Sequence, residues 1–105
     1  MTFDIIPTTN FLKELKALAK KYPKIKRDIE DLEKSLKENP FQGDALPKSC
    51  FKVRMQITGK PAGKRGGARV ITCVKVVNEK VYLLSIYDKS QQANNEGLDI
   101  LLKGL

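Results

Sequence analysis

The sequence contains no histidine and only two cysteines among its 105 residues. Without histidine, a Ser-His-Asp triad, a Cys-His pair and any zinc site built on imidazole are excluded. Cys50 and Cys73 have no Cys-x-x-Cys spacing and are too few for a disulfide scaffold, so we expect two buried or half-buried, reduced thiols. The carboxylates of the second half are scattered, and we expect neither a metal nor a cofactor.

Long apolar runs are also missing. No stretch of about 18 apolar residues is present that would span a membrane. The N-terminal segment MTFDIIPTTN lacks the basic region and the long apolar region of a secretory signal, so we expect a cytoplasmic protein with no membrane partner. A chain of 105 residues corresponds to one domain, residues 1–105.

Positive charge is in excess and unevenly distributed. The chain carries 20 Lys and Arg against 12 Asp and Glu, a net charge of +8. Residues 1–47 hold nine basic and eight acidic side chains, whereas residues 48–105 hold eleven and four. Clustered positive charge attracts polyanions, so the second half is the expected partner surface for nucleic acid.

The first half shows helical periodicity after a short apolar segment. Residues 3–6 predict a strand that ends at Pro7. Apolar residues then recur at helical spacing through residues 8–38, with a break at Tyr22-Pro23. This pattern predicts an antiparallel helical hairpin whose apolar positions are Phe11, Leu15, Leu18, Tyr22, Ile25, Ile29, Leu32 and Leu36.

The second half changes to the period of two that is typical of strands. After a loop over 41–49, the pattern predicts strands at 51–58, 68–77 and 81–87, of which the last is the most apolar and should be interior. A turn-rich segment at 58–67 and a polar segment at 90–95 connect these elements, and leucine spacing predicts a helix at 98–105. The order β-α-α-β-β-β-α predicts a two-layer α+β fold, in which the N-terminal helical hairpin packs on a small antiparallel β-sheet.

Alternation along the strands gathers cations on one face. Lys52 and Arg54 share the face opposite the apolar residues of their strand. Arg69 begins the next strand and Lys89 follows the one after it, so both should reach the same edge, and Tyr87 shares a face with Lys89. RNA binding is assigned to the neighbouring basic residues Lys48, Lys60, Lys64 and Arg65.

This set of side chains suits cleavage of RNA by its own 2′-hydroxyl. Fixed Arg and Lys donors stabilise the extra negative charge of the pentavalent transition state. Crowded lysines depress one another's pKa, which would let one of them transfer protons. Tyr87 is a second candidate for proton transfer, or for stacking on a base. Simple phosphate binding by the same cations is the alternative reading.

Three segments, in this order, resemble the RelE/ParE toxin superfamily, especially the RelE- and HigB-like toxins of toxin–antitoxin systems. They are CFKVR at 50–54, GGARVI at 66–71 and LLSIYDKS at 83–90. The resemblance covers nearly the whole chain and implies a RelE-like fold. It also implies a metal-independent endoribonuclease (an mRNA interferase) that cuts mRNA in the ribosomal A site and inhibits translation.

The resemblance also implies roles for individual residues. Lys52 and Arg54 would handle proton transfer and phosphate contact, and the base role falls to Lys52 because a guanidinium does not deprotonate. Arg69 would clamp the scissile phosphate, and Lys89 would stabilise the leaving group or the transition state. The family's C-terminal tyrosine has no counterpart after Leu98, so Tyr87 replaces it only by its position on the strand.

The implied partners are mRNA, the ribosome and a cognate antitoxin, which would form a hetero-oligomer with the toxin. The antitoxin would neutralise the cationic face or displace the C-terminal helix. Two other functions fit the same scaffold, namely a ParE-like DNA gyrase inhibitor and a catalytically inactive basic nucleic-acid-binding domain.

Overall fold

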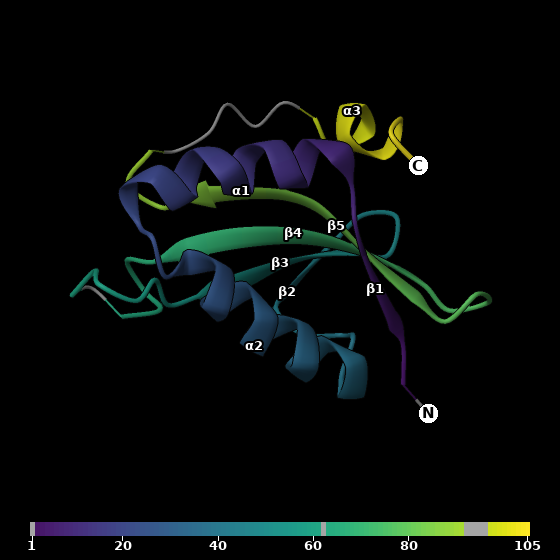
Figure 1. Ribbon diagram of the computed structural model, residues 1–105. Helices are drawn as coiled ribbons and strands as arrows, with labels where there is room; N and C mark the ends of the chain where they lie inside the picture. The colour runs from purple at the N-terminus through teal and green to yellow at the C-terminus, as the bar shows by residue number, and fades with distance from the viewer. Residues whose placement is uncertain (1, 62, 92–96) are drawn as a thin grey trace.

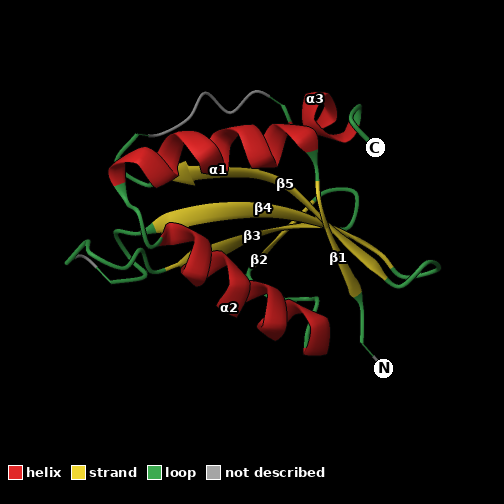
Figure 2. Cartoon of the chain, in the orientation of Figure 1, coloured by secondary structure: helices red, strands yellow, loops and turns green. Residues whose placement is uncertain are grey.

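Two long helices lie across one face of a five-stranded sheet in the computed structural model (Figure 1). The structure describes residues 2–61, 63–91 and 97–105. Their elements are β1 (Asp4–Pro7), α1 (Thr9–Lys21), α2 (Ile25–Glu38), β2 (Asp44–Leu46), β3 (Cys50–Met55), β4 (Ala68–Lys75), β5 (Lys80–Asp88) and α3 (Leu98–Leu102). The predicted α+β class, with the helical hairpin packed on a sheet, is thereby confirmed (Figure 2).

The sheet has the strand order β1-β5-β4-β3-β2. Its centre is the predicted antiparallel meander of β3, β4 and β5, and β5 is interior as expected. The edges differ from the prediction, because β1 pairs with β5 in parallel and the sheet is therefore mixed. The segment expected to be a loop also contributes β2, which pairs antiparallel with β3.

Polar side chains of α1 fix this helix on β5. Thr8 caps the helix by accepting a hydrogen bond from the Phe11 N–H. The β4–β5 register shifts between Ile71 and Thr72, an irregularity that leaves backbone groups of β5 outside the regular ladder. Asn10 donates to the Leu84 carbonyl at 2.9 Å, and Glu14 accepts from the Ile86 N–H at 3.2 Å.

The core lies between the helices and the sheet. Its buried side chains come from α1, α2, β3, β4 and β5, with Phe11, Ile25, Leu36, Ile57, Leu83 and Ile86 among the most completely buried. All of the predicted helical apolar positions belong to this cluster or pack against it. The helical hairpin therefore covers one face of the sheet by burying the stripe that the sequence predicts.

On the opposite face of the sheet, the rear face, the described residues provide cover at one end. Here α3 packs its leucines on a small cluster that includes Cys50, Cys73 and Leu84. Both cysteines are free and fully buried, as predicted, and they lie opposite each other on β3 and β4. The helix is shorter than the predicted 98–105, and residues 92–95 of the predicted polar connection lie outside the described residues.

None of the helices in the described parts of the chain has the length and apolar character needed to cross a membrane.

Candidate functional site

Three predicted site residues form a row across the rear face, at the end where none of the described residues forms a covering helix. Arg54 on β3 is the Cα partner of Arg69 on β4, and Arg69 is the Cα partner of Tyr87 on β5. Residues paired in this way point to the same side of a sheet, with Cβ atoms about 5 Å apart. Arg54 is exposed and Tyr87 is half-buried, so a ligand on this face reaches both. We call these three residues the cationic row.

Two lysines flank the cationic row. Lys52 lies two residues before Arg54 on the same face of β3 and is half-buried. Lys89 follows β5, is exposed, and donates its backbone N–H to the Gly67 carbonyl at 2.9 Å, which extends the β4–β5 pairing past Tyr87. The five residues predicted to be catalytic therefore belong to one end of the sheet, although they come from three strands.

The surroundings of Lys52 differ from the crowding of lysines that the sequence suggested. Its Cα partners are Asp44 on β2 and Ile71 on β4. Neither is basic, so the cross-strand positions do not bring other lysines beside it.

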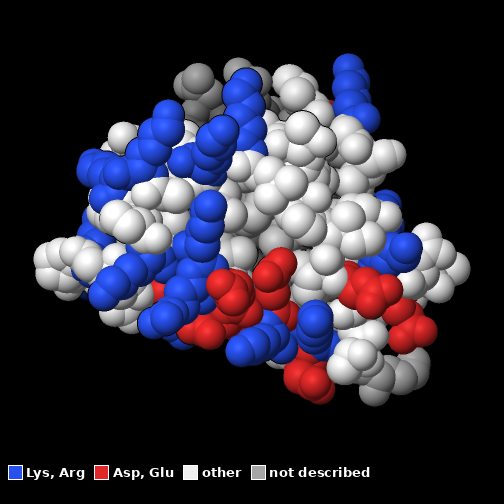
Figure 3. All heavy atoms as spheres, viewed as in Figure 1, with Lys and Arg blue, Asp and Glu red and all other residues white. Residues whose placement is uncertain are grey.

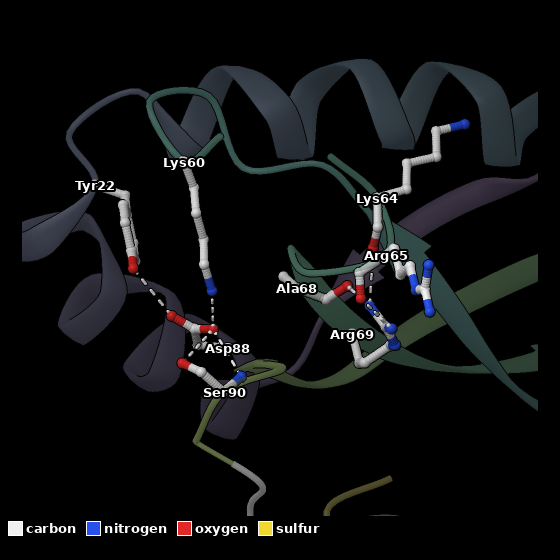
Figure 4. A network of polar contacts seen from close by, with 8 residues as sticks. All are labelled: Tyr22, Lys60, Lys64, Arg65, Ala68, Arg69, Asp88 and Ser90. Atoms are coloured by element: carbon white, nitrogen blue, oxygen red, sulfur yellow. Dashed lines mark hydrogen bonds and ion pairs between the residues drawn. The ribbon is translucent and has the colours of Figure 1, made fainter. Parts of the chain in front are cut away.

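Arg69 is buried and already engaged. Only 5% of its surface is exposed, and its guanidinium donates to the carbonyls of Lys64 at 3.1 Å and Arg65 at 2.9 Å (Figure 4). A third hydrogen bond goes to the carbonyl of Ala68. Arg69 thus uses most of its donors to hold the loop at 58–67 against β4. Its charge lies below the protein surface, whereas Arg54 is exposed.

This loop brings two of the predicted RNA-binding residues to the site. Lys64 and Arg65 are both exposed, and their carbonyls are the ones that Arg69 holds. Gly67 ends the loop where it packs directly on β3, because a Cβ atom there would lie 2.1 Å from the Met55 carbonyl oxygen. Glycine is required at this position by the close approach of two backbones.

The other two predicted RNA-binding residues lie elsewhere. Lys60 is largely buried, at 18% exposure, and forms an ion pair with Asp88 at 2.6 Å on the helix side of the sheet. Lys48 is exposed but forms an ion pair with Asp99 of α3, at the opposite end of the rear face. The fold therefore separates the four predicted RNA-binding residues, and of these only Lys64 and Arg65 lie beside the cationic row.

A second basic surface was hidden by the balanced charge of the first half. Residues 9–27 carry seven basic side chains and one acidic one, Glu14, which is half-buried and bonded to β5. Figure 3 shows Lys and Arg gathered over α1, whereas over α2 Asp and Glu lie among further Lys and Arg. The spacing of Lys13, Lys16 and Lys20 was the available signal, since residues three and four apart share one helix face.

The available chemistry is that of fixed cations and a phenol. No group of three or more cysteine, aspartate or glutamate side chains suited to holding a metal ion occurs in residues 2–61, 63–91 and 97–105. Arg54, Lys52, Lys89 and Tyr87 lie at one end of the sheet. Side chains of these types can bind phosphate, stabilise developing negative charge and transfer protons.

With this geometry established, the fold can be assigned by comparison with solved structures, and it is RelE-like. The chain is similar to the toxin RelE of E. coli, solved in the free state as a variant with two arginines changed to alanine. The match covers 99% of this chain and 94% of that one, with a TM-score of 0.64 and 13% sequence identity. No protein-family model and no curated protein sequence matches this chain.

Proposed function

We propose that this protein is the toxin of a toxin–antitoxin pair, and that it acts as a ribosome-dependent endoribonuclease on mRNA in the A site. The observation that carries the proposal is the cationic row of Arg54, Arg69 and Tyr87, flanked by Lys52 and Lys89, on a fold similar to that of a known toxin. A metal-free set of this kind suits attack by the RNA's own 2′-hydroxyl.

In the proposed reaction, the 2′-oxygen forms a bond to phosphorus while the bond to the 5′-oxygen breaks. The 2′-hydroxyl proton passes to Lys52 or Tyr87, whichever acts in its unprotonated form, and the Lys89 ammonium donates a proton to the leaving 5′-oxygen. Arg54 is exposed and would contact the phosphate directly, a role that the resemblance gave to Arg69. Arg69 is buried, and its charge would stabilise the transition state without direct contact. The ribosome would supply the geometry of the substrate, which accounts for the small number of groups needed.

The lysines of α1 support a second contact with RNA in this proposal. They lie on the helix side of the sheet, away from the cationic row, so they would bind a different RNA segment from the one that is cut. Changing Lys13, Lys16 and Lys20 to glutamine should raise KM on programmed ribosomes and lower its salt dependence, with kcat little changed. A matched loss of three charges at Lys34, Lys37 and Lys80 serves as the control.

The antitoxin is proposed from the same fold similarity. An acidic partner chain would neutralise the cationic row, or would displace α3 from the rear face, and the complex would be a hetero-oligomer. Hydrogen exchange of the amides of Lys103, Gly104 and Leu105, which donate to carbonyls of α3, distinguishes the two modes, since displacement and unwinding of α3 removes their protection.

Induced expression with mapping of mRNA ends tests the proposal against its alternatives. An mRNA interferase arrests growth and leaves cuts within translated codons. A gyrase inhibitor instead blocks supercoiling of plasmid by purified gyrase, and an inactive binding domain does neither. Growth arrest without mRNA cuts, together with inhibited supercoiling, would overturn the proposed RNA cleavage.

A further inference from the structure

Asp88 is a buried carboxylate at the end of β5, between Tyr87 and Lys89 of the candidate site. Only 1% of its surface is exposed. Its Cα partner is Ala68, which belongs to the core under the helices, so Asp88 faces the helix side while Tyr87 faces the rear side. A buried charge is costly unless it is paired and hydrogen-bonded, so its partners indicate why it is tolerated.

Four polar contacts surround this carboxylate (Figure 4). One oxygen accepts from Lys60 Nζ at 2.6 Å and from the backbone N–H and hydroxyl of Ser90 at 3.0 and 2.9 Å. The other accepts from the Tyr22 hydroxyl at 3.0 Å. Three segments therefore meet at Asp88, namely the end of α1, the loop at 58–67 and the turn after β5.

The loop at 58–67, which we call the basic loop, is held from both sides of the sheet. Lys60 connects it to Asp88 on the helix side, and Arg69 holds the carbonyls of Lys64 and Arg65 on the rear side. Its first residue is also fixed, because Asp28 of α2 accepts a hydrogen bond from the Thr58 N–H at 2.8 Å. A glycine-containing loop that carries charge would otherwise sample many conformations.

We infer that Asp88 is a positioning residue, which fixes the basic loop against the end of β5 so that both present their cations to the same RNA. This inference rests on the proposed RNA cleavage for its consequence, although the contacts themselves do not. It assigns Lys60 a structural partnership with Asp88 in place of the RNA contact expected from the sequence. Substrate contact is left to Lys64 and Arg65 of the loop and to Arg54 and Tyr87 of the cationic row.

A double-mutant cycle on programmed ribosomes tests this role. Asp88→Asn and Lys60→Gln should each lower kcat by roughly tenfold, and the double variant should lose no more than either single one, because both changes remove the same link. Lys60→Arg keeps the charge and should retain most of the activity. Asp31→Asn, an exposed change on α2, is the matched control. A Lys60→Gln variant that raises only KM would overturn the inference in favour of direct RNA binding.

A second readout is independent of activity. Trypsin cleavage after Lys64 and Arg65 reports opening of the loop, and Lys60 itself precedes Pro61, so its replacement removes no favoured cleavage site. Asp88→Asn and Tyr22→Phe should speed this cleavage, and circular dichroism should show that both variants are folded. Asp31→Asn should leave the cleavage rate unchanged. Unchanged cleavage in folded Asp88→Asn would overturn the positioning role. A wild-type protein that cuts no RNA would instead overturn only the proposed function.

Discussion

Arg54 and Arg69 are direct cross-strand partners on β3 and β4, yet one is exposed and the other is buried. Like charges at such positions repel, and the structure resolves this by turning the Arg69 guanidinium to three backbone carbonyls. The pair therefore divides two tasks, with contact to phosphate at Arg54 and support of the basic loop at Arg69.

This division predicts different results for the two alanine variants. Arg54→Ala should lower kcat/KM at least tenfold, about 1.4 kcal/mol of transition-state stabilisation, with the melting temperature little changed. Arg69→Ala should lower both kcat/KM and the melting temperature, since the carbonyls of Lys64 and Arg65 lose their donor. Steady-state rates and thermal melting measure the two effects. Equal loss of stability in both variants would contradict the division.

Tyr87→Phe separates the two chemical roles open to this residue. The phenylalanine retains an aromatic ring on the half-buried strand end but cannot transfer a proton. If Tyr87 takes part in proton transfer, cleavage should slow by about 10²-fold. Single-turnover cleavage rates make the distinction, and a rate within about twofold of wild type would indicate stacking alone.

Gly67→Ala should destabilise the fold by about 1–3 kcal/mol, because the added methyl group would overlap the Met55 carbonyl. Gly104→Ala is the control, since its Cβ would have only an ordinary contact, 3.5 Å from the Leu101 carbonyl oxygen. Denaturant unfolding gives both values. A Gly67→Ala protein as stable as wild type would show that β3 and the loop do not approach as closely as described.

Asp88 should also make stability dependent on pH. Burial alone raises its pKa, but the bonds from Lys60, Ser90 and Tyr22 outweigh burial and hold the pKa at about 2, below the ordinary 3.8. A lowered pKa stabilises the folded state above pH 4, and this stabilisation is lost as the pH falls toward 2. Its size is about 2 kcal/mol.

Unfolding free energies of wild type and Asp88→Asn, measured from pH 5 to pH 2, check this expectation. The gap between the two proteins should narrow as the pH falls, because protonation removes the charge that the variant lacks. Asp31→Asn gives the background from an exposed carboxylate. A gap that stays constant over this range would contradict the role of the ionised carboxylate.

Local patterns predicted most of the fold, and they failed where partners distant in sequence decide the structure. Alternation placed Lys52 and Arg54 on the same face, and the helical stripe identified the core of α1 and α2. The parallel pairing of β1 depends on β5, which lies about 75 residues further along the chain. The three residues of β2 are too few for a period-two pattern to be recognised.

The positions of the site residues were easier to predict on the strands than on the loops. A strand fixes the side of each residue, and the order of neighbouring strands in a meander fixes which ends meet, so the two together predicted that Arg54, Arg69 and Tyr87 lie near one another. Lys60 lies on a loop, where sequence does not fix direction, and the carboxylate of Asp88 draws it to the helix side. The lysines of α1 were overlooked because α2 carries compensating acidic residues, and averaging over the first half cancelled the two.

The most direct test of ribosome-dependent cleavage uses purified protein with a defined, end-labelled mRNA, either free or held on ribosomes with an open A site. The account predicts cuts within the A-site codon only when ribosomes are present, fragments ending in a 2′,3′-cyclic phosphate, and strong loss of both in Arg54→Ala. Cleavage of free RNA at the same rate, or fragments ending in a 3′-hydroxyl, would contradict it.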